Sequence, residues 1–130
     1  MIRFNDLFKG FGRKQVLNGM TLEIPDGETT VIIGFSGTGK SVALKHIVGL
    51  LEPDAGGVEV DGQLVHELDP DGLASLRAHV GYVFQFAALF DSMSVADNIR
   101  LGLARRGLGV EEILTRIRDS LALVDLSGAE

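Results

Sequence analysis

The sequence contains no cysteine, and its 130 residues include only 3 prolines. Without cysteine the chain forms neither disulfides nor thiolate–zinc sites, a composition that fits a reducing compartment. The histidines, His46, His66 and His79, lie far apart and show no metal-ligand spacing. No apolar run approaches the ~20 residues that a membrane-spanning helix needs, and the N-terminus lacks the apolar stretch of a signal peptide. These absences predict a soluble, cytosolic domain.

Basic side chains are also scarce. Lysine and arginine number 12 against 18 aspartates and glutamates, which gives a net charge of −6. Non-specific binding to nucleic acid requires a basic stripe, so we expect no nucleic-acid partner. Hydrophobic residues make up 45% of the chain, enough for a real core, and the length allows one domain.

Glycine is abundant, at 17 residues, and it lies between apolar runs, a distribution typical of loops that separate secondary-structure elements. Alternating patterns predict half-buried strands over residues 1–8 and 20–24. A hairpin is expected over residues 57–65, turning at Asp61-Gly62. The short β-branched or apolar runs at residues 29–33 and 80–84 predict strands buried on both faces of a sheet.

Helical spacing of apolar residues begins after Lys40 and predicts a helix that continues to Leu51 and is stopped by Pro53. Ser94, with Asp97 three residues later, is typical of a capping-box start. The last predicted helix carries an apolar face formed by Val110, Ile113, Leu114, Ile117, Leu121 and Val124. Strands interleaved with helices indicate an α/β fold, with antiparallel hairpin material near the front of the chain.

Residues 34–41 match the phosphate-loop pattern G-x-x-x-x-G-K-[ST] in full. The glycines let successive N–H groups point at phosphate oxygens, Lys40 adds a positive charge between the β- and γ-phosphates, and the Ser41 hydroxyl is placed to ligate Mg²⁺. The following helix directs its positive dipole end into the same space. A dinucleotide fingerprint fits less well, because the third glycine is replaced by Val42. The residues expected to bind the nucleotide are Gly34, Phe35, Ser36, Gly37, Thr38, Gly39, Lys40, Ser41 and Val42.

Two segments outside this loop carry a resemblance to a known family. Residues 11–17 follow a strand some two dozen positions before the loop, and Gln85 ends the apolar run of the second core strand. With the phosphate loop, they resemble the ABC-transporter ATPases. The resemblance implies that Phe11 stacks on adenine and Val16 packs near the ribose, with Phe8 as the competing aromatic residue. It also implies that Gln85 reaches Mg²⁺ and the attacking water, and that ATP and Mg²⁺ are the cofactors.

The resemblance implies an α/β fold of the P-loop NTPase type, with an antiparallel β-subdomain and an incomplete parallel core sheet with helices. Residues 86–99 narrow the resemblance to one subfamily. Their Gln-x-x-Ala-Leu-Phe and later Val-x-Asp-Asn patterns resemble the ATPases of bacterial MCE-associated lipid importers. Membrane permease subunits would then dock near the apolar loop from Phe86 to Met93, and a second ATPase subunit would complete a dimer. The implied substrate is a phospholipid or related hydrophobic molecule, and the implied place is the cytoplasmic face of the inner membrane.

The resemblance covers all 130 residues but about half of a family domain. Residues 126–130 imitate the family's signature with Ala129 in place of its second glycine, and residues 121–125 imitate the Walker B strand. We expect both to be the end of a helix and its loop, and residues 87–91, a third imitation, to be a loop. Residues 1–130 are thus expected to be the N-terminal part of the ATPase domain, inactive alone, marginally stable and prone to self-association.

Two other functions remain open. One is a nucleotide-binding module that does not hydrolyse ATP, and the other is a soluble ABC-type ATPase that is not linked to a permease.

Overall fold

The computed structural model describes residues 1–86, 88–103 and 107–130. The chain folds into two compact units, Met1–Tyr82 and Val83–Glu130, which are described separately below. Ala87, part of the predicted docking loop, lies outside the described residues. None of the helices in the described ranges is long and apolar enough to cross a membrane.

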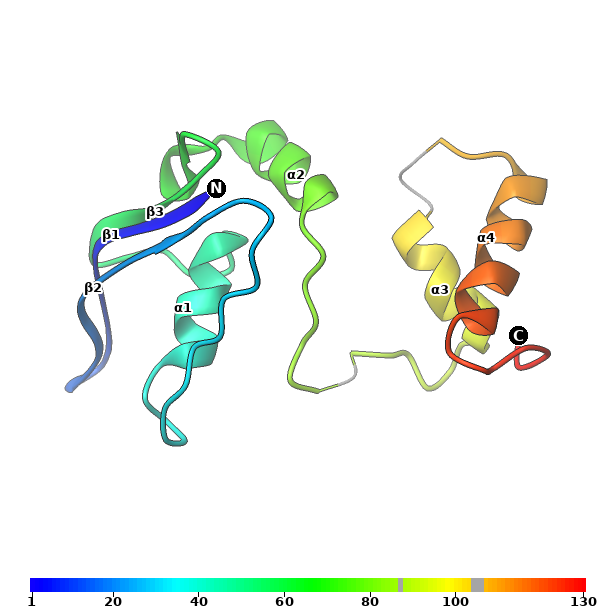
Figure 1. The fold of residues 1–130 in the computed structure, drawn as a ribbon, viewed down its shortest axis with the longest axis horizontal. Coiled ribbons are helices and arrows are strands. Elements are labelled where there is room, and N and C mark those ends of the chain that lie inside the picture. Colours follow the sequence, from blue (N-terminus) through cyan, green and yellow to red (C-terminus); the bar gives the residue numbers. More distant parts are fainter. Residues whose placement is uncertain (87, 104–106) are drawn as a thin grey trace. The chain divides into compact units, whose positions relative to one another are not determined.

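The first unit is built on a four-stranded antiparallel sheet, with strand order β2-β1-β3-β4 (Figure 1). Its strands are β1 (Ile2–Phe11), β2 (Lys14–Ile24), β3 (Ala55–Val60) and β4 (Gln63–Leu64). In the register, Phe4 lies opposite Leu22 on β2 and Val58 on β3. The hairpin turn at Asp61-Gly62 has positive φ at both residues, 49° and 83°, as a two-residue turn of this chemistry requires. The predicted strands of the front region and the hairpin are confirmed.

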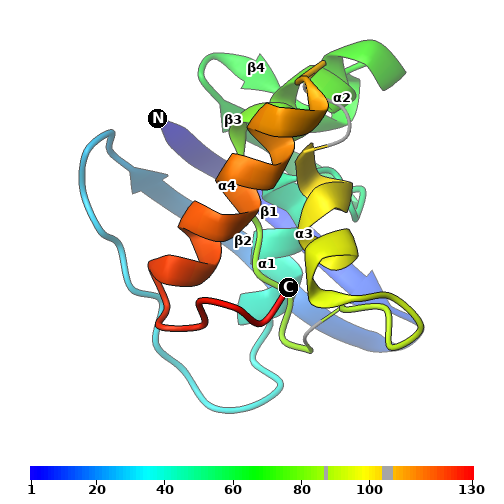
Figure 2. The same ribbon diagram turned by 90° about the vertical axis from the view of Figure 1, so that its right-hand side faces the viewer.

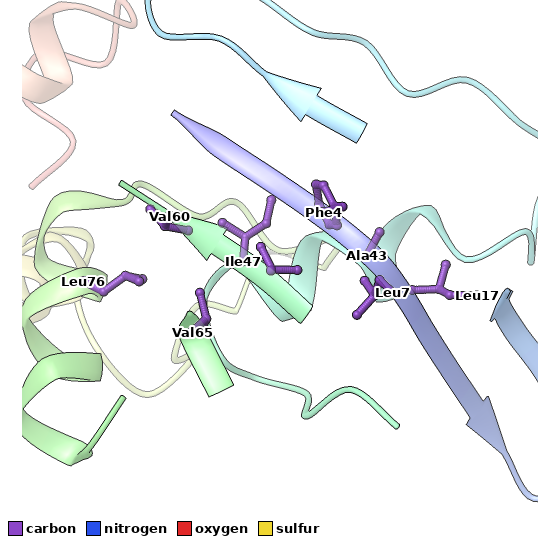
Figure 3. Packing of buried hydrophobic residues seen from close by; sticks show 9 residues of the cluster. Phe4, Leu7, Leu17, Ala43, Ile47, Val60, Val65 and Leu76 are labelled. Carbon is purple, nitrogen blue, oxygen red and sulfur yellow. The ribbon is translucent and has the colours of Figure 1, made fainter. Parts of the chain in front are cut away.

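Helix α1 (Lys40–Ile47) packs against β2 and β3 and closes the core of this unit (Figure 3). Alternate residues of the strands and one face of the helix supply the buried side chains, which is the pattern that period-2 and period-3.6 spacing dictate. Phe4 and Leu7 have no exposed side-chain surface. The other buried members are Leu17, Ala43, Ile47, Val58, Val60, Val65 and Leu76.

The end of α1 differs from the prediction. The helix stops at Ile47, well before Leu51 and Pro53. Gly49 takes up a left-handed conformation, φ 62°, and the amides of Gly49 and Leu50 donate to the carbonyls of His46 and Lys45 at 3.2 and 2.9 Å. These two bonds form a Schellman motif, so a glycine ends the helix and the proline follows it.

Helix α2 (Pro70–His79), together with the short 3₁₀ turn η1 (Val65–Glu67), was not predicted. The Asp69 side chain accepts from the Gly72 amide at 2.7 Å, and Pro70 occupies the first helical position. From α2, the Arg77 guanidinium donates to the carbonyls of Val48 and Gly49 at 2.9 and 3.0 Å. A cation therefore closes the negative end of α1, the helix that begins at the phosphate loop.

The predicted strands at residues 29–33 and 80–84 are wrong for this structure, in which neither run pairs in a sheet. Val31 and Ile33 are 72% and 90% exposed, and Val83 is 94% exposed. All strand pairs among the described residues are antiparallel, so the expected parallel part of the sheet is not formed there. A run buried on both faces needs a neighbouring strand for its N–H and C=O groups, and no described segment supplies one.

In the second unit, α3 (Val95–Leu103) packs against α4 (Val110–Ala122), as Figure 2 shows. The capping box is confirmed, because the Ser94 hydroxyl accepts from the Asp97 amide at 3.1 Å and donates to the Asp97 carboxylate at 2.9 Å. Ile117 and Leu121 are buried on the predicted face of α4, whereas Val110 at its start is exposed. Val124, predicted to lie on the same face, is exposed in the turn that follows the helix.

The described residues of the three imitations of other family motifs form no strand. Residues 121–125 are the last turn of α4 and the turn after it, and residues 126–130 form a further turn whose last carbonyl accepts from the Ala96 amide at 2.8 Å. The described part of the third imitation, residues 88–91, is a loop. The expectation of helix ends and loops is confirmed for these segments.

Candidate nucleotide-binding site

The phosphate loop, residues 34–39, runs directly into α1, and two of its glycines are required by the backbone. Gly37 and Gly39 have φ angles of 77° and 98°, which residues other than glycine rarely adopt. A Cβ on Gly39 would lie 2.8 Å from Leu17 Cδ2 and 3.2 Å from the Val16 carbonyl oxygen. The loop therefore lies against β2 at a distance that only glycine permits, and β2 fixes where α1 begins.

Lys40, the first residue of α1, folds back over the loop. Its ammonium donates to the carbonyl oxygens of Gly34 and Phe35 at 2.7 and 2.8 Å, and the Thr38 hydroxyl donates to the same Phe35 oxygen at 2.8 Å. No carboxylate among the described residues lies within ion-pair distance of this ammonium. The positive charge is thus held by neutral carbonyls only, and an entering phosphate would face no competing anion.

The start of α1 is open to a ligand. Gly39 is the N-cap residue and, having no side chain, leaves the helix without a side-chain cap. The first-turn N–H groups and the Lys40 ammonium therefore concentrate positive potential at one point. The Ser41 side chain is exposed, while Val42 packs against the core. Val42 could thus meet a nucleotide only through its backbone N–H.

The two aromatic candidates for base stacking differ in their surroundings. The Phe8 ring is 3.2 Å from the position that a Cβ on Gly19 would take, so it packs onto β2 and is half-buried. Phe11, at the end of β1, is 48% exposed. Val16 lies on β2 beside the phosphate loop, as its short approach to Gly39 shows. Phe11 therefore offers the free ring face, and its role and that of Val16 stay predictions.

Ser41 and Gln85, the two predicted Mg²⁺ ligands, belong to different units of the chain. Both side chains are exposed. Their meeting on one metal ion stays a prediction. The described residues contain no group of three or more histidine, aspartate or glutamate side chains that could hold a metal ion.

One residue beside this site was missed by the sequence reasoning. Asp54, in the loop after α1, accepts from the Lys9 ammonium at 2.8 Å and from the Gly10 amide at 2.7 Å. The hydrogen bond from Lys9, and secondly that from Gly10, hold the pKa of Asp54 below its usual value. An acid forty-odd residues from its partners has no local sequence signal that would reveal it.

Comparison with solved structures defines the class of protein. The dimeric structure of MJ0796, a bacterial ABC transporter cassette, matches with a TM-score of 0.88 and 31% identity, over 98% of this chain and 59% of that one. A post-hydrolysis dimer of the same cassette bound to ADP and Pi matches with a TM-score of 0.87 and 30% identity, over the same shares of the two chains. The fold is that of the N-terminal portion of an ABC ATPase cassette.

The sequence comparisons name the family. Residues 17–129 match the ABC transporter family, and the chain belongs to it. The probable ribonucleotide transport ATP-binding protein mkl of Mycobacterium tuberculosis is 42% identical over 99% of this chain and 36% of its own length. The chloroplastic protein TRIGALACTOSYLDIACYLGLYCEROL 3 of Arabidopsis thaliana is 42% identical over 100% of this chain and 38% of its own. The chain thus spans little more than a third of the length of these relatives.

Proposed function

We propose that this chain is the N-terminal part of the ATP-binding subunit of an ABC transporter, in which ATP binding and hydrolysis drive transport. The observation that carries the proposal is the junction of residues 34–39 with α1. There a glycine loop, an ammonium with no carboxylate partner among the described residues, and a helix start without a side-chain cap converge. Such a concentration of donors and positive charge is suited to the polyphosphate of a nucleotide.

On binding, the Lys40 ammonium would leave the carbonyls of Gly34 and Phe35 for the phosphate oxygens, exchanging neutral acceptors for charged ones. Mg²⁺ commonly binds through few protein oxygens together with substrate phosphates. The exposed Ser41 hydroxyl fits that use, with Gln85 as the second protein ligand and the contact to attacking water. Phe11 would hold the adenine, and Val16 would pack near the ribose.

Hydrolysis is proposed for the full-length protein and not for these 130 residues alone. The segments that imitate the signature and Walker B are turns and a helix end in this chain. A signature acts by aiming backbone N–H groups and a helix N-terminus at phosphate, which the turn at residues 126–130 does not do. In the full-length protein, two copies would enclose ATP between them, an arrangement supported by the dimeric MJ0796 cassette.

The proposed cargo is a phospholipid or a related hydrophobic molecule, and the proposed place is the cytoplasmic face of the inner membrane. The motifs in residues 86–99 support the lipid cargo, and so does the relative from Arabidopsis, because its name includes that of a galactolipid. Exposed Phe86, Leu89 and Phe90 supply the apolar surface expected where permease subunits dock. Ribonucleotide transport is the second candidate, because the mycobacterial relative at the same identity bears that name.

The central experiment compares Lys40→Ala with Lys45→Ala in the full-length protein. Both changes remove one lysine from α1, but Lys45 lies in the last turn, away from the loop. We expect Lys40→Ala to abolish most ATP binding in calorimetry and phosphate release, and Lys45→Ala to leave both nearly unchanged. Equal behaviour of the two variants would contradict the phosphate-loop assignment. Tight ATP binding by the wild type without turnover would instead favour a non-hydrolysing module.

The transport part of the proposal needs its own readout. We expect the full-length protein to co-purify with a membrane permease, and ATP turnover by that complex to rise in phospholipid vesicles. If ribonucleotides, and not phospholipid, stimulate ATP turnover by the complex, the proposed cargo becomes a ribonucleotide. An active ATPase that never associates with a permease would favour the soluble ABC-type alternative.

A further inference from the structure

The loop that follows α1 returns to the end of β1, the strand that carries Phe11. Strand pairing between β1 and β3 ends with Phe8 opposite Ala55. One residue before Ala55, the Asp54 amide donates to the Phe8 carbonyl at 2.9 Å. Beyond this point β1 continues through Phe11 with β2 as its only strand neighbour in the described part of the chain, and there Gly10 pairs with Gln15 and Phe11 with Lys14. The last residues of β1 therefore have one free edge.

Asp54 takes the place of the absent strand at that edge. One carboxylate oxygen accepts from the Gly10 amide at 2.7 Å, a bond that a neighbouring strand would otherwise provide. The other accepts from the Lys9 ammonium at 2.8 Å. Charge-assisted bonds of this length are stronger than bonds between neutral groups. One oxygen of Asp54 thus fixes the backbone of Gly10 and the other fixes the side chain of Lys9, and both of these residues lie within two positions of Phe11.

Lys9 extends this contact to the aromatic ring. Its ammonium lies over Phe11, 5.8 Å from the ring centroid, within the range of a cation–π interaction. The Lys9 side chain is largely buried, and its ion pair with Asp54 limits where the ammonium can go. One face of the Phe11 ring is thus occupied by a held cation, and the ring still keeps about half of its surface exposed.

We propose that Asp54 is a positioning residue for base recognition. It holds Lys9 across one face of Phe11 and fixes the Gly10 backbone, so that the opposite face is presented to the base of the nucleotide. This inference rests on the proposed function, in which Phe11 is the adenine platform. It adds that the loop behind the phosphate-loop helix sets the position of that platform, so one short segment joins the base site to the end of α1.

The test separates the base from the phosphates. In the full-length protein, dissociation constants for ATP and for inorganic triphosphate are measured for Asp54→Asn, Lys9→Met and Phe11→Ala. Asp54→Asn keeps the shape of the side chain and removes its charge. Glu52→Gln is the matched control, since Glu52 is an exposed acid two residues away whose carboxylate makes no hydrogen bond or ion pair within the described part of the chain.

Phe11→Ala is expected to weaken ATP roughly 5- to 150-fold, the range that base–aromatic stacking supports. Asp54→Asn and Lys9→Met are each expected to weaken ATP binding about two- to fivefold, as loss of a cation–π contact on a half-exposed ring predicts. Triphosphate binding should stay unchanged in all three variants, and Glu52→Gln should change neither ligand. In the Phe11→Ala background, Asp54→Asn should cause no further loss of ATP affinity.

The outcomes distinguish the inference from the function on which it rests. If Phe11→Ala is selective for ATP and Asp54→Asn and Lys9→Met are not, the role of Asp54 is wrong while the platform stands. If Phe11→Ala weakens both ligands equally, the platform lies elsewhere and the inference falls with it. Should Asp54→Asn bind neither ligand because it does not fold, Lys9→Met decides the question alone. An equal loss in Glu52→Gln would show a general charge effect and overturn the role of Asp54.

Discussion

Strand β1 and residues 29–33 both lie in segments that the sequence predicts as strands, but only β1 pairs in a sheet. Both are rich in apolar or β-branched residues, and both lie in the first unit. Phe4 and Leu7 of β1 are completely buried between two neighbouring strands and α1, whereas Ile33 is 90% exposed. The difference lies in pairing: β1 has β2 and β3 beside it, and residues 29–33 have no strand partner among the described segments.

The comparison shows that an apolar β-branched run specifies an extended chain but not burial. Burial of a strand requires partners for its backbone groups on each edge, because unpaired N–H and C=O groups cannot leave water without a free-energy penalty. β1 meets that condition through β2, its hairpin partner, and through β3, which returns to it from beyond α1, while a parallel strand needs a crossover connection to its partner. The buried and exposed runs can therefore be told apart by mutation.

The largest expected effect is on Leu7. Leu7→Ala should lower the free energy of unfolding of the 130-residue chain by about 2–5 kcal/mol, because it removes a fully buried side chain and leaves a cavity. Ile33→Ala should change it by less than about 0.5 kcal/mol, as expected for an exposed site. Urea unfolding followed by circular dichroism measures both. A cost at Ile33 comparable to that at Leu7 would show that residues 29–33 are buried in solution.

A smaller effect is expected on association. The exposed apolar run at residues 29–33 has no strand partner among the described residues, so its backbone can template pairing with a second chain. We expect the 130-residue chain to self-associate and Val31→Lys to weaken that association about tenfold, or ~1.4 kcal/mol. Val110→Lys is the matched control, since both valines are 72% exposed but Val110 lies on a helix. Sedimentation that shows a monomer throughout, or an equal effect of both lysines, would contradict the proposed edge.

Features with local signals could be predicted from the sequence, and features that depend on distant partners could not. The phosphate loop, the start of α1, the turn at Asp61-Gly62 and the Ser94 cap each follow from residues within a few positions of one another. Helix α2 also has a local signal, an aspartate cap followed by Pro70 at the first helical position. The bonds of Asp54 and Arg77, by contrast, reach 45 and 29 residues along the chain to Lys9 and Val48. Folding, and not any motif, brings those groups together.

The smallest expected effect is a pH dependence of stability that arises from His46, a buried residue of the first unit. His46 on α1 is 2% exposed and lies in the packed interior of the first unit. Its Nδ1 donates to the Val42 carbonyl at 2.8 Å, and its Nε2 is buried without a hydrogen-bond partner among the described residues. Burial lowers the pKa of His46 below its usual value. The backbones of Val42 and Glu52 and the carboxylate of Asp54 oppose this shift in pKa, while the Lys9 ammonium adds to it.

The sign of the resulting pH dependence follows from the direction of that shift. Because the folded chain protonates His46 less readily than the unfolded chain does, its contribution is complete above about pH 6.5, the ordinary histidine value. As the pH falls below that value, the unfolded state binds the proton first, and stability decreases by at most about 1.4 kcal/mol per pH unit until the folded pKa is reached. Urea unfolding at a series of pH values should show this slope in the wild type. His46→Leu should remove it, and the exposed control His79→Gln should retain it. A slope that survives in His46→Leu, or disappears in His79→Gln, would place the titrating group outside the core.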